Sequence, residues 1–177
     1  GDTMKRRDLL GMTMSAALLP AAALAKGASK ASTGRTRARP GTPAWPGAQA
    51  WQSLRTETGG RLLALSSPFA RGQSDAVRAE AVAGLKNPYY IGDNPALTQT
   101  SGWQDAWTSR ASAYAVAARD AADVAAAVKF AKRHNLRLVV KGGGHSYFGA
   151  SNAPDSLLVW TRSMNKVAMV DAFVAQG

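Results

Sequence analysis

Residues 141–147 are the part of this chain best suited to chemistry. They read Lys-Gly-Gly-Gly-His-Ser-Tyr, so three consecutive glycines stand directly before a histidine. Glycines give the backbone conformations that other residues cannot adopt, and they remove every Cβ that would keep a ligand at a distance. The histidine is then held against whatever the glycine loop surrounds. The pattern predicts a cofactor site in which His145 does more than bind.

Short apolar segments and one helix must position this loop. Residues 136–140 form an apolar, β-branched run typical of a buried strand, and residues 157–160 predict the next strand after a turn-rich segment. Upstream, Asp120 is a predicted helix N-cap and Asn135 a predicted stop. Residues 113–117 alternate as a strand does. The predicted unit is strand, helix, strand, glycine loop, strand.

Two common phosphate-binding motifs do not fit the glycines. With Gly142 and Gly144 as the first pair of a G-x-G-x-x-G fingerprint, the third glycine would fall on Tyr147. That fingerprint also requires a helix to follow, whereas a turn and a strand are predicted here. The other motif, G-x-x-x-x-G-K-[ST], is absent because no Gly-Lys-Ser or Gly-Lys-Thr occurs in the chain.

A different glycine-loop pattern, that of a known protein family, fits. Residues 139–151, preceded by a helix over 123–131, resemble the first FAD-binding lobe of the vanillyl-alcohol oxidase superfamily, the PCMH-type FAD-binding domain. Within the superfamily the sequence is most similar to the berberine-bridge-enzyme-like oxidoreductases. Residues 87–95, running on to 102–107, resemble the lead-in of bacterial members. The resemblance implies an α+β fold, and it extends from about residue 87 to the end of the chain.

In that family the glycine loop lies along the flavin and the pyrophosphate of FAD. The resemblance implies a covalent flavin, with His145 joined to the 8α-methyl group. The predicted cofactor-binding residues are Lys141, Gly142, Gly143, Gly144, His145, Ser146, Tyr147, Gly149 and Ser151. Neutral imidazole is a competent nucleophile, and backbone N–H groups freed by glycines make a concave anion site. The resemblance also implies hydride transfer from a sugar, alcohol or related small-molecule substrate to FAD, and it assigns no catalytic residue here.

An alternative interpretation is a basic nucleic-acid-binding or other interaction module with a non-catalytic glycine loop. The formal net charge is +11, and eight of the basic side chains fall in residues 1–40. A nucleic-acid-binding face gathers its charge together with aromatic residues. Here the basic residues are divided between the N-terminus and a helix end, which disfavours that interpretation. The positive field of Lys141 and Arg137 near the loop suits a pyrophosphate equally well.

The sequence gives no indication of a metal site or a disulfide. Cysteine is absent, and only two histidines occur, with no H-x-x-H pattern and no carboxylate cluster. The second histidine, His134, is expected to complement the dipole at a helix C-terminus and so to have a structural role.

The N-terminus resembles an export signal. Arg6 and Arg7 precede a mildly apolar stretch over 9–25, which contains Pro20 and ends in Ala-Leu-Ala. The stretch is too short to span a bilayer, and small residues of this type favour cleavage. Residues 1–25 therefore predict a signal peptide for the twin-arginine translocase, with the protein exported to the periplasm or the extracellular space.

The remaining chain divides by composition. Residues 26–47 are rich in Gly, Ala, Ser, Arg and Pro, and they predict a disordered linker. Residues 48–106 are interpreted as an N-terminal extension that packs on the main domain. Residues 107–177 are interpreted as an incomplete first FAD-binding lobe, because 170–177 resemble an interrupted strand. We therefore expect a truncated N-terminal fragment of a larger oxidase, inactive alone.

Overall fold

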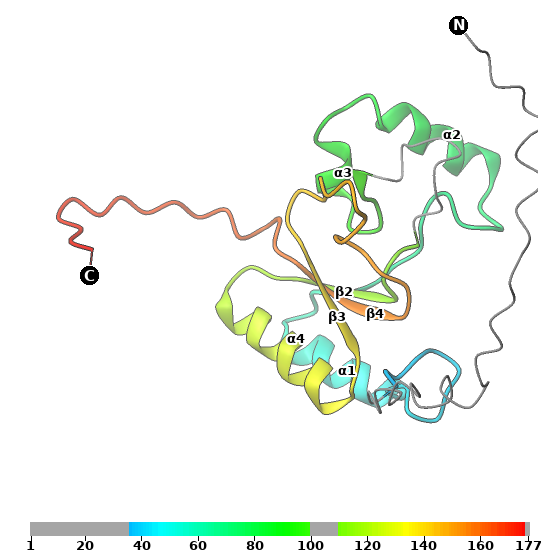
Figure 1. Cartoon of the computed structure of the whole chain (residues 1–177), viewed down its shortest axis with the longest axis horizontal. Coiled ribbons are helices and arrows are strands. Elements are labelled where there is room, and N and C mark those ends of the chain that lie inside the picture. The colour runs from blue at the N-terminus through cyan, green and yellow to red at the C-terminus, as the bar shows by residue number, and fades with distance from the viewer. Residues whose placement is uncertain (1–35, 100–109, 176–177) are drawn as a thin grey trace, which may run out of the picture. The chain divides into compact units, whose positions relative to one another are not determined.

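The computed structural model describes residues 36–99 and 110–175 of the chain. These residues form a mixed α+β fold, as predicted (Figure 1). The helices are α1 (Ala48–Glu57), α2 (Asp75–Gly84), α3 (Tyr90–Asp93) and α4 (Ala121–Arg133). The strands are β1 (Leu62–Ala64), β2 (Tyr114–Ala117), β3 (Arg137–Lys141) and β4 (Ser156–Trp160).

The strands form one mixed sheet in the order β1-β2-β4-β3. β1 is antiparallel to β2, whereas β2, β4 and β3 are parallel to one another. Parallel strands need a crossover connection between them. α4 provides it between β2 and β3, and residues 142–155 provide it between β3 and β4 without a helix. The predicted order of strand, helix, strand, glycine loop and strand is therefore confirmed.

α4 begins and ends where its sequence predicts. The Asp120 side chain accepts a hydrogen bond of 3.0 Å from the backbone N–H of Asp123, which is the N-cap interaction. Asn135 follows the helix with a φ of 51°, a left-handed conformation that asparagine adopts more readily than most residues. Between these ends, Ala127 and Phe130 are buried on the face that meets the sheet.

α1 and α4 pack on the same face of the sheet. Trp51 of α1 stacks on Tyr114 of β2 with ring centroids 4.1 Å apart, and it lies 4.9 Å from the ring of Phe130 in α4. These three rings join the apolar cluster that contains Val116 and Leu157 from the centre of the sheet. Aromatic side chains bury large apolar areas, so this cluster is a major part of the core.

The described part of the predicted linker is folded onto this core. Ala38 is 3% exposed, and its N–H donates to the carbonyl of Asn135 at 3.1 Å. The start of the predicted extension also belongs to the domain, since residues 62–64 are the edge strand of the sheet. The segment over 36–47 is held by single buried residues and by main-chain contacts. Such contacts give no apolar periodicity, so the sequence predicts a linker there.

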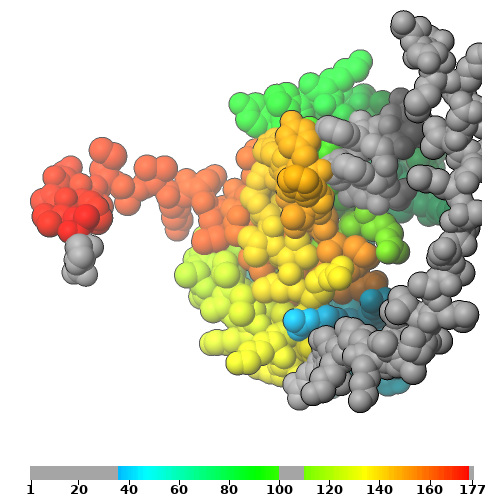
Figure 2. Space-filling model, viewed as in Figure 1, coloured from blue at the N-terminus to red at the C-terminus, as the bar shows by residue number. Residues whose placement is uncertain are grey.

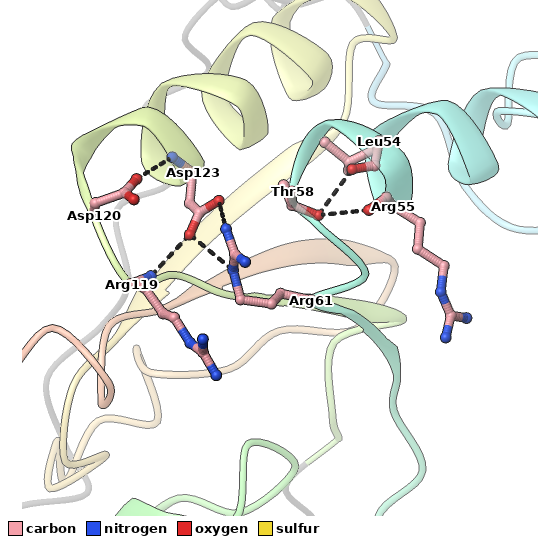
Figure 3. A network of polar contacts seen from close by, with 7 residues as sticks. All are labelled: Leu54, Arg55, Thr58, Arg61, Arg119, Asp120 and Asp123. Atoms are coloured by element: carbon pink, nitrogen blue, oxygen red, sulfur yellow. Dashed lines mark hydrogen bonds and ion pairs between the residues drawn. The ribbon is translucent and has the colours of Figure 1, made fainter.

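An ion pair joins the edge strand to α4. Arg61, directly before β1, donates to both carboxylate oxygens of Asp123, at 2.6 Å and 3.1 Å (Figure 3). The same carboxylate accepts the backbone N–H of Arg119 at 2.9 Å. Asp123 is 3% exposed. The hydrogen bonds from Arg61, and then that from Arg119, lower the pKa of Asp123 against the opposing effect of burial.

We expect Asp123→Asn to lower the free energy of unfolding by about 2 kcal/mol at neutral pH, because it removes a charged pair of hydrogen bonds. A carboxylate with a lowered folded pKa stabilises the protein above its unfolded pKa of about 4. That stabilisation is lost as the pH falls through the lowered folded value. Urea unfolding at neutral pH and at acid pH should therefore show the difference between variant and wild type shrinking in acid.

Asp120→Asn is the matched control for this change, because asparagine caps a helix as well as aspartate does. Its unfolding free energy should stay within about 0.5 kcal/mol of wild type. Equal losses in the two variants, or a loss in Asp123→Asn that does not depend on pH, would contradict a role for the ion pair.

The chain leaves the sheet after β4. Residues 161–175 contain no strand, so the interrupted strand predicted over 170–177 is not found in its described part, 170–175. Val167 and Met169 are 90% and 88% exposed. Figures 1 and 2 show this orange-to-red segment extending away from the sheet.

Two sequence predictions fall outside the described residues: the export signal over 1–25 and the aromatic lead-in over 102–107. Within 36–99 and 110–175, no helix is both long and apolar enough to cross a bilayer.

Candidate functional site

The glycine loop leaves the C-terminal end of β3 beside α3 (Figure 1). In open sheets with parallel strands, ligands bind outside the carboxyl ends of the strands, which is where this loop begins. No helix starts within residues 142–155. The structure therefore agrees with the sequence in excluding the dinucleotide fingerprint, whose third element is a helix N-terminus.

Lys141, the last residue of β3, supports the loop from inside the protein. It is 1% exposed, and its ammonium group donates to the carbonyls of Ile91, Asn94 and Leu97 at 2.8, 2.6 and 2.6 Å. Burial, and secondarily the Arg162 guanidinium, lower the pKa of Lys141 to about 8, so the group is protonated at neutral pH. All three ammonium protons are used by the main chain. Lys141 therefore positions the loop, and its ammonium points inward instead of towards a ligand.

Gly144 is a glycine because the buried lysine leaves no room for a side chain. Its φ is +79°, and a Cβ there would lie 2.7 Å from Cε of Lys141 and 3.3 Å from Cγ2 of Ile91. Real Cβ atoms do not approach so closely, and L-residues avoid this φ. The third glycine is therefore required by the fold itself.

The first two glycines differ in what surrounds them. A Cβ on Gly143 would lie 2.7 Å from Cδ2 and 3.0 Å from Nε2 of His145, so the imidazole ring occupies that space. A Cβ on Gly142 would meet only Oγ1 of Thr161, at an ordinary contact distance of 3.7 Å. Gly142 is exposed, and nothing in the described protein requires it to be a glycine. Its bare backbone is open to a ligand.

His145 is held by Gln99, a residue that the sequence did not identify. The Gln99 side-chain oxygen lies 3.2 Å from Nδ1 of His145, and the Gln99 N–H donates to the carbonyl of Gly144 at 2.8 Å. An amide oxygen only accepts, so this contact is made by the tautomer with its proton on Nδ1 and its lone pair on Nε2. Gln99 is 46 residues earlier in the chain, and no motif connects the two positions.

The other predicted cofactor residues continue along the same loop. Tyr147 is 59% exposed, Ser146 is half-buried, Gly149 has a φ of 70°, and Ser151 is 9% exposed. Phe148, which was not predicted as a site residue, is 96% exposed beside them. The structure thus brings the nine predicted residues together on one loop, and the direct contact of each with FAD stays a prediction.

A second polar anchor holds the returning end of the loop. Asn152 accepts hydrogen bonds from the N–H and the hydroxyl of Ser112, at 2.6 and 2.7 Å, and donates to the carbonyl of Pro95 at 3.0 Å. The Ser156 hydroxyl donates to that of Ser112 at 2.8 Å. The sequence predicted only a turn here, because pairing of distant polar side chains has no local signature.

Arg137 does not contribute to the loop as expected. It is the first residue of β3 and Lys141 is the last. At about 3.3 Å per residue the two Cα atoms are about 13 Å apart along the strand. The predicted positive field at the loop therefore lacks Arg137, which lies at the opposite end of the sheet.

His134 packs against α4 as a neutral group. Its ring centroid lies 4.4 Å from that of Phe130, and burial, followed by the charge of Arg133, lowers its pKa. Its structural role therefore comes from packing and not from a positive charge at the helix end. In the described ranges, no group of three His, Cys, Asp or Glu side chains is arranged to hold a metal ion.

The part of the chain that contains the loop is similar to a known sequence family. Residues 112–176 match the family described as FAD binding domain. The FAD-linked oxidoreductase easE of Claviceps fusiformis is 28% identical over 173 residues, which is 83% of this chain and 30% of that protein. The VAO-type flavoprotein oxidase VAO615 of Thermothelomyces thermophilus is 39% identical over 62 residues, 35% of this chain and 11% of that protein.

Solved structures show the same fold. The crystal structure of the VAO-type flavoprotein MtVAO615 from Myceliophthora thermophila C1 matches with a TM-score of 0.61 and 28% identity, over 78% of this chain and 29% of that one. The described fold is therefore similar to part of a VAO-type flavoprotein. MtVAO713 from the same organism has a similar fold, with a TM-score of 0.63 at 22% identity, over 74% of this chain and 26% of that one.

The chain covers only a small part of the relatives that it matches. The chain spans 13% of the length of easE from Claviceps purpurea and 30% of easE from Claviceps fusiformis.

Proposed function

We propose that this chain is part of an FAD-dependent oxidoreductase whose cofactor lies along residues 141–151. The observation that carries the proposal is the pair formed by Gly142 and His145. The main chain at Gly142 is accessible to a ligand, and the fold itself does not require a glycine there. The imidazole of His145 lies against Gly143 and contacts Gln99. A loop built in this way suits close approach of a flat, anionic ligand.

The chain's own residues fit FAD in three ways. Lys141 holds the loop from the interior of the protein, so its ammonium group does not occupy the exposed side of the loop. Backbone N–H groups of the glycines suit the pyrophosphate, and the Gln99 side-chain oxygen orients the imidazole of His145 through Nδ1. When bound, FAD accepts a hydride from the C–H bond of a substrate.

We further propose that His145 is the covalent attachment residue. The bond joins an imidazole nitrogen to the 8α carbon of the flavin. His145 would give up its imidazole N–H proton in forming this bond, and the two electrons released with the methyl hydrogen would pass through the flavin to an acceptor such as dioxygen. The neutral tautomer that Gln99 favours supplies the lone pair this step needs.

The wider assignment rests on the family resemblance given in the sequence analysis and on the first residues of the chain. We propose a small-molecule substrate such as a sugar, an alcohol or a related compound, and a berberine-bridge-enzyme-like subtype. Arg6 and Arg7 support export through the twin-arginine translocase to the periplasm or the extracellular space. That route moves folded proteins, which suits a protein that acquires its cofactor before export.

Gly142→Ala tests the cofactor site without disturbing the fold. Because its Cβ would meet only Thr161 at 3.7 Å, we expect an unfolding free energy within about 1 kcal/mol of wild type. The FAD content of the purified complete gene product should nevertheless fall at least severalfold, as judged by flavin absorbance per chain. The new methyl group would occupy the space that the cofactor needs.

Gly47→Ala is the matched control, since a Cβ there meets nothing within 4 Å and lies away from the loop, before α1. Its flavin content should equal that of wild type. Full flavin occupancy in Gly142→Ala would overturn the proposed placement of FAD on this loop.

A further inference from the structure

We propose a second anion site, separate from the flavin loop, that binds a small phosphate-bearing molecule. A cavity of about 280 Å³ lies at the N-terminal ends of β3 and β4. Four arginines line it, together with a single carboxylate: Arg37, Arg39, Arg110, Arg137 and Asp155. They come from four segments that are far apart in the sequence.

The N-terminal side of the pocket is a strap over 36–39 that is tied to Asn135. The N–H of Ala38 donates to the Asn135 carbonyl at 3.1 Å, and the Asn135 side chain donates to the carbonyl of Thr36 at 2.9 Å. Arg37 donates to the Asn135 side-chain oxygen at 3.2 Å. Figure 2 shows the blue strap lying against the yellow surface that includes the start of β3. Two of the four arginines thus belong to a folded segment, and the Arg37 side chain is held by its own hydrogen bond.

The opposite side of the pocket is fixed by the polar anchor described above. Ser112 lies two residues after Arg110, in the segment that leads into β2. Its hydrogen bonds to Asn152 hold this segment against residues 152–156. Asp155 has a φ of 57°, a left-handed turn conformation, and it stands directly before the first residue of β4. The walls are therefore set by contacts made without any ligand.

The positive charges that line this pocket have no ion-pair partner among the described residues. None of its four guanidinium groups forms an ion pair with a carboxylate of the described residues, whose ion pairs are Arg61–Asp123 and Arg162–Asp93. With Asp155 counted against them, the lining carries a formal surplus of three positive charges. Guanidinium groups bind phosphate oxygens in a planar, bidentate manner. A phosphate monoester or diphosphate, with at least two negative charges, matches the surplus.

The pocket differs from the flavin loop in position and from a nucleic-acid-binding face in composition. Arg137 and the loop lie at opposite ends of β3, about 13 Å apart. No aromatic residue lines the cavity, whereas nucleic-acid surfaces extend basic stripes interleaved with aromatics. The concave shape and the lack of stacking groups favour a small anion.

Isothermal titration of the FAD-saturated complete gene product with inorganic pyrophosphate, at low salt, tests the site. Saturation with FAD keeps the probe from the flavin loop. We expect one saturable site per chain, with its Kd raised at least about tenfold by the double change Arg110→Gln and Arg137→Gln. Arg39→Gln should weaken binding in the same direction. Among the described residues the Arg39 side chain makes no hydrogen bond, so this change leaves the contacts between the strap and Asn135 intact.

Arg78→Gln, on the exposed surface of α2, is the control and should leave the Kd unchanged. Absence of saturable binding, or equal weakening by Arg78→Gln, would overturn the proposal. If a duplex oligonucleotide displaces pyrophosphate at lower concentration and with the same arginine dependence, the site serves nucleic acid and the small-anion assignment is wrong.

Discussion

Lys141→Met is expected to lower the free energy of unfolding by about 3 kcal/mol and to release the segment over 91–99 from the glycine loop. Methionine fills much of the same volume but donates no hydrogen bond. The carbonyls of Ile91, Asn94 and Leu97 would then lose the ammonium that now reaches them at 2.6 to 2.8 Å. A buried acceptor left without a partner costs about 1–3 kcal/mol, part of which water can recover.

The release should be visible locally as well as globally. The Gln99 amide donates to Gly144, and we expect its hydrogen exchange to accelerate in the variant because the segment that carries it has lost its anchor. Flavin content should fall with it, since His145 would no longer be held by Gln99. Chemical denaturation, hydrogen exchange and flavin absorbance together follow the three effects.

Lys129→Met is the matched control, because Lys129 is an exposed position of α4 and methionine is a good helix former. It should change stability by no more than about 0.5 kcal/mol. If Lys141→Met proved as stable as this control, with unchanged exchange at Gln99, Lys141 would not be the anchor of the loop.

His145→Ala should abolish the covalent attachment of flavin while leaving the fold intact. The ring is exposed, and within the described part of the chain its side chain makes one hydrogen bond, to Gln99, so its removal costs little stability. Wild-type protein that has been denatured in acid and washed should keep its yellow colour. The variant, treated in the same way, should lose all of its flavin to the supernatant.

The chain offers a matched control, because it contains only one other histidine. His134→Ala removes a packing contact with Phe130 at the far end of α4, and we expect its flavin to stay attached. Flavin retained on the washed His145→Ala protein would assign the attachment to another residue. Flavin lost from the washed wild-type protein would remove the covalent proposal while leaving the cofactor site in place.

Local sequence signals predicted the part of the fold that carries the site. Asp120 and Asn135 stand directly beside the ends of α4, so the residue types at these positions predict where the helix begins and ends. The apolar runs of β3 and β4 predict these strands in the same local way. The glycine loop was equally visible. These features depend on neighbours a few residues apart, which is the range over which a sequence pattern can be read.

Long-range polar contacts could not be predicted in the same way. Gln99 and Asn152 owe their roles to partners 46 and 40 residues away, and a lysine after a strand gives no sign that it will be buried. The composition of the strap over 36–39, which has no apolar periodicity, predicts a linker. The structure shows that its two arginines line one pocket together with Arg110 and Arg137.

The most direct test of the account is the mass of the peptide that contains His145, released from the acid-washed complete gene product. We predict a peptide heavier by one flavin, with the modification on His145. A protein that is colourless as purified, takes up no added FAD and yields only the unmodified peptide would contradict the proposal that this loop is a flavin site.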